Sequence, residues 1–107
     1  PYYNTVFATL TGGANDTVYT VTDQSILLTA IRAVDDGGVA RTVEVIFTRS
    51  AVNRILVPTA SAIAINAALN TAFDPCIVLL KDDVIKATGS AAGVELAVTF
   101  VRQGRRS

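Results

Sequence analysis

The chain has 107 residues, 50% of them hydrophobic and 17% charged, and its nine basic and nine acidic side chains give a formal net charge of zero. This length suits one domain with one core, so residues 1–107 are predicted to form a single domain. The neutral balance argues against direct nucleic-acid binding, which requires a concentrated basic surface.

The low charged fraction predicts that part of the surface is covered. A soluble monomer usually carries charge on about a quarter of its residues, so we expect either self-association or docking on a larger assembly. A compact domain rich in Ala and Val that tolerates low charge is the alternative. No run approaches the ~18 uninterrupted apolar residues of a membrane helix, and no membrane partner is expected.

The residue types present restrict the possible chemistry. The chain has no histidine and a single cysteine, Cys76, so a Ser–His–Asp triad, a Cys–His pair, a histidine-ligated metal and an intrachain disulfide are impossible. The acidic pairs Asp35 with Asp36 and Asp82 with Asp83 lie in predicted turns, where aspartate bonds to nearby backbone. We therefore expect no enzymatic activity, metal, cofactor or small-molecule ligand, and we expect Cys76 to pack in the core or at an interface.

The first third of the chain predicts three strands. Residues 4–10 alternate and end at a glycine turn, and residues 17–21 are rich in β-branched and aromatic side chains. Residues 25–34 are apolar on both faces, with Ile26, Leu28 and Ala30 predicted on one face and Leu27, Thr29 and Ile31 on the other. Such a strand is either central in a sandwich or covered by a neighbouring subunit.

The segment Asp35-Asp36-Gly37-Gly38 predicts a hairpin, because Asp-Gly and Gly-Gly suit the backbone twist between two antiparallel strands. Its partner strand is predicted at residues 40–49, with Val43, Val45 and Phe47 on one face. A short strand at residues 54–57 then ends at Pro58. Residues 59–73 show two conflicting periodicities, and the segment between residues 58 and 75 is predicted to form an irregular crossover with at most one short helix.

Residues 77–102 predict three successive strands joined by two tight turns, which we interpret as a β-meander. In the last strand Val94, Leu96, Val98 and Phe100 alternate with more polar positions, as expected for a sheet over a core. About seven or eight short strands result. The predicted fold class is all-β, an antiparallel β-sandwich with a Greek-key or jelly-roll path and one irregular crossover.

Several segments between Thr17 and Arg102 carry a further pattern: TVYTV, ILLTAIRAV, DDGG, ARTVEVIF and the closing PCIVLLKDDVIKATGSAAGVELAVTFVR. In this order they resemble a family of small β-sandwich virion proteins of tailed bacteriophages. The shared features are structural turns and alternating strands rather than catalytic motifs. This chain departs from the family in having Asp82 where glycine is usual before Asp83, so a different turn is expected there.

The resemblance implies a structural role in a phage particle, most specifically that of a capsid decoration or cement protein on the outer capsid surface, made in the host cytoplasm. The implied partners are the major capsid protein and copies of the chain itself, often as a trimer. A neck, tail, baseplate or fibre component, or a host-recognition module, is the alternative. A glycan-binding version is less favoured, because the chain has no tryptophan and only three tyrosines.

Three segments are the predicted contact regions: an amino-terminal arm (residues 1–4), the Ala-rich crossover (residues 60–70) and the carboxy-terminal tail (residues 102–107). The arm and residues 103–107 are each expected to be flexible or partner-bound. The two adjacent tyrosines either anchor the arm in an interface or begin an edge strand. The candidate contact residues are Pro1, Tyr2, Tyr3, Asn4, Ala62, Ile63, Ala64, Ile65, Arg102, Arg105 and Arg106.

Overall fold

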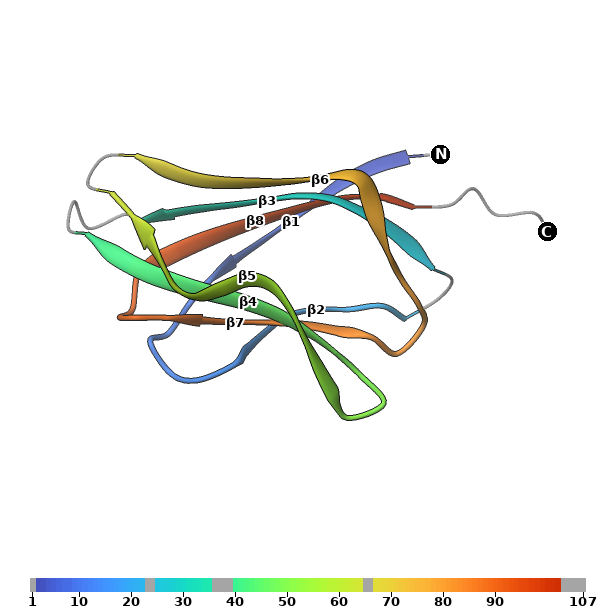
Figure 1. Ribbon diagram of the computed structural model, residues 1–107, viewed down its shortest axis with the longest axis horizontal. Coiled ribbons are helices and arrows are strands. Elements are labelled where there is room, and N and C mark those ends of the chain that lie inside the picture. The colour runs from blue at the N-terminus through green and yellow to red at the C-terminus, as the bar shows by residue number, and fades with distance from the viewer. Residues whose placement is uncertain (1, 23–24, 36–39, 65–66, 103–107) are drawn as a thin grey trace.

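The computed structural model describes residues 2–22, 25–35, 40–64 and 67–102. Within these residues it contains eight β-strands and no helix, which confirms the predicted all-β sandwich (Figure 1). The described residues also contain no helix of the length and apolarity needed to cross a membrane. The strands are β1 (Tyr2–Thr9), β2 (Asp16–Thr20), β3 (Ile26–Asp35), β4 (Arg41–Arg49), β5 (Val52–Ile63), β6 (Ala68–Leu79), β7 (Val84–Gly89) and β8 (Val94–Arg102).

The strands form two four-stranded antiparallel sheets. The first sheet has the order β1-β8-β3-β6, and the second has the order β2-β7-β4-β5. Among the eight described strands, only β4 and β5 are consecutive in the chain and also adjacent in one sheet. The other connections pass from one sheet to the other (Figure 1). Pairing of β1 with β8, β2 with β7, β3 with β6 and β4 with β5 is the jelly-roll path.

The core lies between the two sheets and follows the predicted alternation. On β8, Val94, Leu96, Val98 and Phe100 are at most 1% exposed. On β4, Val43, Val45 and Phe47 face the same core. The ring of Phe100 packs on that of Tyr19 from the opposite sheet, with centroids 5.0 Å apart.

A bulge in β3 corrects the predicted faces of that strand. The register of β3 with both of its neighbours shifts between Leu28 and Ala30. An extra residue changes which face the following side chains take, so Ile31 joins Ile26 and Leu28 in the core. Ala30, predicted to share a face with Ile26 and Leu28, instead lies on the outer face of the first sheet with Leu27.

The hairpin predicted at Asp35 is wrong. β3 belongs to the first sheet and β4 to the second, so these strands do not pair; Asp36, Gly37 and Gly38 lie outside the described residues. The residue types of a turn indicate only which local backbone conformations are favourable. The same conformations are also suitable for a connection from one sheet to the other.

The β-meander predicted for residues 77–102 is also wrong, although its strands are present. β6 and β8 lie in the first sheet, and β7 lies between β2 and β4 in the second. All three strands need burial of one face. Alternating between the layers provides this burial just as well as side-by-side pairing does.

The crossover predicted between residues 58 and 75 is shorter than expected. β5 continues to Ile63 and β6 begins at Ala68, and the described part of the segment contains no helix. The chain does cross there from the second sheet to the first. Backbone hydrogen bonds of β5 to β4 and of β6 to β3 stabilise the extended conformation more than the weak helical preference of the alanines stabilises a helix.

Candidate partner-binding face

The outer face of the first sheet forms rows of side chains across the four strands, and these rows are interrupted only at the β3 bulge between Leu28 and Ala30. One row joins Tyr3, Val101, Leu27 and Val78, and a second runs from Phe7 over Ala97 and Arg32 to Asn70. We call this array the outer face. It consists of Tyr3, Thr5, Phe7 and Thr9 on β1; Glu95, Ala97, Thr99 and Val101 on β8; Leu27, Ala30, Arg32 and Val34 on β3; and Ala68, Asn70, Ala72 and Val78 on β6.

Most side chains of the outer face are apolar or small, and several are well exposed. Tyr3 and Phe7 are each 76% exposed and Val78 is 47% exposed. Val101 is buried although it does not belong to the core cluster, because Tyr3 and Leu27 flank it in the same row. Apolar side chains gathered on one sheet face are typical of a surface that a partner covers.

Charge is sparse on the outer face. Among the residues assigned to it, Arg32 and Glu95 are charged, one of each sign, and both are exposed; Asp74 of β6, between Ala72 and Val78, is exposed as well. Within the described residues neither Arg32 nor Glu95 has an ion pair or side-chain hydrogen bond. A partner that covers the face would therefore meet one unsatisfied charge of each sign.

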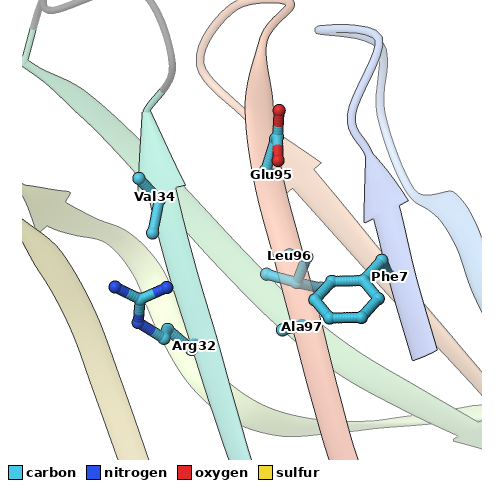
Figure 2. A pocket seen from close by; sticks show the side chains of 6 residues that line it. All are labelled: Phe7, Arg32, Val34, Glu95, Leu96 and Ala97. Atoms are coloured by element: carbon cyan, nitrogen blue, oxygen red, sulfur yellow. The ribbon is translucent and has the colours of Figure 1, made fainter. Parts of the chain in front are cut away.

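A shallow hollow lies beside Phe7 on this face. It has a volume of about 140 Å³ and is lined by Phe7, Arg32, Val34, Glu95, Leu96 and Ala97 (Figure 2). The small Ala97 separates the ring of Phe7 from Arg32 and so leaves the space open (Figure 2). Pockets for small molecules are usually about 300 to 1,000 Å³, so the hollow fits one inserted side chain better.

The outer face of the second sheet is more polar. Its exposed and half-buried positions include Glu44, Lys86 and several threonines. Its apolar neighbours are Ile46, which is 5% exposed, and Ile55, which is 64% exposed. The two outer faces of the sandwich therefore differ in character, and the first is the better candidate for binding a protein surface.

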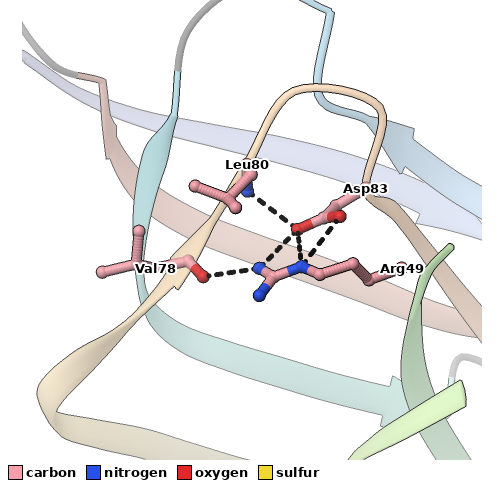
Figure 3. A network of polar contacts seen from close by, with 4 residues as sticks. All are labelled: Arg49, Val78, Leu80 and Asp83. Carbon is pink, nitrogen blue, oxygen red and sulfur yellow. Dashed lines mark hydrogen bonds and ion pairs between the residues drawn. The ribbon is translucent and has the colours of Figure 1, made fainter. Parts of the chain in front are cut away.

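The strongest polar cluster lies elsewhere, at one end of the sandwich. Asp83 is 2% exposed and accepts hydrogen bonds from Arg49 Nη2 at 2.7 Å, Arg49 Nε at 3.0 Å and the Leu80 N–H at 2.8 Å (Figure 3). Arg49 Nη2 also donates to the Val78 carbonyl at 3.1 Å. These contacts tie the end of β4 to the first sheet and to the turn before β7.

The electrostatics of this cluster favour the ion pair. Burial raises the pKa of the Asp83 carboxyl, but hydrogen bonds from Arg49 and the Leu80 N–H, with the charge of Arg49, outweigh burial and hold that pKa below its usual range. The hydrogen bond to Asp83 raises the pKa of Arg49. Both carboxylate oxygens of Asp83 accept hydrogen bonds from protein donors. The cluster therefore has a structural role at this end of the sandwich.

The predicted contact residues are not brought together into one site. Tyr2, Tyr3 and Asn4 belong to β1, as the edge-strand alternative predicted, and Tyr2 is opposite Arg102 in the register. Ala62 and Ala64 are exposed where β5 leads to β6, at the other end of the sandwich in Figure 1. Pro1, Ile65, Arg105 and Arg106 lie outside the described residues.

One of the predicted contacts, Ile63, needs correction. Ile63 is 1% exposed and belongs to the core, because its position in β5 directs it inward. Arg102 is half-buried, and its Nη2 donates to the Tyr19 hydroxyl at 3.4 Å. Cys76 is half-buried on β6. Among the described residues, no group of three or more His, Cys, Asp or Glu side chains is placed to hold a metal ion.

The main residues of the outer face, including Phe7, Val78 and Ala97, are not among the residues predicted from the sequence. One signal was available: both faces of residues 25–34 are apolar, which predicted a central strand or one covered by a neighbour. β3 is indeed internal in its sheet and exposes Leu27 and Val34 in part. Comparison with protein-family models finds no matching family, and comparison with curated proteins finds no matching relative.

Proposed function

We propose that this chain is a structural protein of a virion, a capsid decoration or cement protein, and that it docks on a protein shell through the outer face of its first sheet. The observation that carries the proposal is the apolar, nearly uncharged array that includes Tyr3, Phe7 and Val78. The phage setting comes from the sequence resemblance. The jelly-roll path is compatible with it, since that architecture is common in viral shells, but fold alone does not imply function.

A flat face of this kind suits lattice stabilisation. A shell protein offers an extended surface, and specific interfaces bury about 800 Å² on each partner. Aromatic side chains in the middle of such an interface contribute large apolar area. Phe7, beside the hollow on the edge strand β1, is 76% exposed and offers such an area to a partner.

The test is co-sedimentation with empty heads assembled from the major capsid protein encoded in the same genome. Phe7→Glu should weaken binding to the heads at least about tenfold, because it buries an unpaired carboxylate in an apolar contact. Ile55→Glu is the matched control, since Ile55 is similarly exposed on the second sheet. Equal binding by the two variants would contradict the proposed face.

Electron microscopy of phage particles locates the protein and tests whether it belongs to the virion. Density on the outer lattice supports decoration. Density confined to the neck, tail or baseplate would replace the decoration role with the alternative one. Absence of the chain from purified particles would contradict the virion proposal.

A further inference from the structure

We propose that β1 is an open sheet edge that pairs antiparallel with β1 of a second copy of this chain. The two first sheets then form one continuous sheet across a two-fold axis centred on Thr5. The inference concerns the edge of the sheet rather than its outer face, and it does not depend on the proposed virion role.

Three of the four edge strands carry features that discourage further pairing. β2 is five residues long and has a register shift, and β5 contains Arg54, Pro58 and register shifts. β6 contains Asp74 and Pro75 and is irregular opposite β3. Charge, proline, shortness and bulges are the features that proteins use to protect sheet edges.

β1 has none of these features. Its eight residues, Tyr2–Thr9, contain no charge and no proline, and they pair with β8 without a register shift. Among the strands that the structure describes, none pairs with the opposite side of β1. A long, regular and uncharged edge is a template for another strand.

The free backbone groups can be assigned. The N–H of Leu10, just after β1, donates to the Val94 carbonyl at 2.8 Å. In an antiparallel ladder every second residue bonds to the same neighbour, so the even-numbered residues of β1 bond to β8. Tyr3, Thr5 and Phe7 therefore direct their N–H and C=O groups to the open edge.

The same three residues place their side chains on the outer face. When two copies of β1 pair through their free groups, Thr5 lies opposite Thr5 of the second copy, and Tyr3 lies opposite Phe7 of the second copy. Both exposed aromatic side chains then gain a cross-strand aromatic partner, which is a favourable pair in a sheet. Each odd-numbered residue of β1 is then paired with an odd-numbered residue of the second copy. The outer faces of the two copies therefore lie on the same side of the combined sheet.

Charge also favours the antiparallel arrangement. Arg102 lies beside Tyr2 at one end of β8, and Glu95 lies beside Thr9 at the other end. A two-fold axis brings the Arg102 end of each copy next to the Glu95 end of the other. The two β8 strands are about three strand spacings apart, roughly 14 Å, which exceeds the screening length of about 10 Å, and Arg102 is directed towards Tyr19, so this attraction has the correct sign but adds little.

The first experiment measures mass by sedimentation equilibrium over a range of concentrations. We expect the unchanged protein to form a dimer and Thr5→Lys to raise the dimer dissociation constant at least about tenfold, because like charges meet directly at the axis. Thr20→Lys, on an exposed position of β2, should leave the constant unchanged. Circular dichroism of dilute samples checks that each variant is folded.

A second experiment tests the register independently. In a Cys76→Ser background, Thr5→Cys should give a disulfide-linked dimer on mild oxidation, because residues opposite each other in a hydrogen-bonded pair have Cα atoms about 5.5 Å apart. Thr20→Cys is the matched control and should remain unlinked. A monomer at all concentrations, a trimer as implied by the resemblance, or a dimer that survives Thr5→Lys would overturn the proposal.

Discussion

Arg49 and Asp83 form a side-chain ion pair that ties the last residue of β4 to the turn before β7, with Arg49 Nη2 2.7 Å from Asp83 Oδ2. The Asp83 side chain is 3% exposed and that of Arg49 is 39% exposed. Removal of the carboxylate would leave the Leu80 N–H and Arg49 Nε without this acceptor, and Arg49 Nη2 would keep the Val78 carbonyl. This contact therefore links the end of β4 to β6 and to the turn before β7.

Asp83→Asn should lower the free energy of unfolding by about 1 to 3 kcal/mol, because an amide cannot accept all the hydrogen bonds of the carboxylate and loses its charge. Asp82→Asn is the matched control. Asp82 is exposed, has a φ of 75°, and asparagine tolerates this backbone region. Urea denaturation measures both variants, and equal midpoints would contradict the role of Asp83.

The Asp83 pair should also make stability depend on acid. The folded-state pKa of Asp83 is lowered, so folding favours the ionised form. The stabilisation is present above the unfolded-state pKa of about 3.9 and is lost as the pH falls towards the lower folded-state value. The urea midpoint of the unchanged protein should fall as the pH is lowered from neutral into acid, and Asp83→Asn should make this fall smaller. If the midpoint of the variant falls with pH as steeply as that of the unchanged protein, the ion pair is not the source of the acid dependence.

The β4–β5 hairpin should be open to stabilisation. Its two turn residues, Ser50 and Ala51, have φ angles of 52° and 63°, a region where Asn and Gly are strongly preferred in two-residue hairpins. Replacing them with Asn and Gly should raise the free energy of unfolding by about 1 kcal/mol. Ala62→Gly, within β5, should instead lower it by about 0.5 to 1 kcal/mol, and thermal unfolding can compare the two.

Gly12 should tolerate no side chain. Its φ is 91°, and a Cβ at this position would lie 2.9 Å from the Ala92 backbone nitrogen. Gly12→Ala should therefore cost about 1 to 3 kcal/mol of stability. At the neighbouring Gly13 a Cβ would meet only Thr11 Oγ1, at 3.4 Å, so Gly13→Ala should change stability by less than about 0.5 kcal/mol. Similar melting temperatures for the two variants would contradict this prediction.

The turns illustrate what sequence patterns could not predict. The segment that begins at Asp35 has the composition of a hairpin, yet it leads from one sheet to the other. The actual hairpin has Ser50 and Ala51 at its turn, with no glycine. Turn propensity describes the dihedral angles of a few residues, whereas the sheet that the next strand joins depends on contacts distant in the sequence.

The amino-acid sequence by itself determined that this protein is all-β and which side chains of strands such as β4 and β8 are buried. The period-two alternation of apolar residues requires one covered face, whatever the neighbouring strand is. Only the tertiary structure decided the strand order, the open edge of β1 and the gathering of Tyr3, Phe7 and Val78 on one face. Backbone ladder bonds are chemically alike for every pair of strands, so the partner of each strand is set by how the whole core packs.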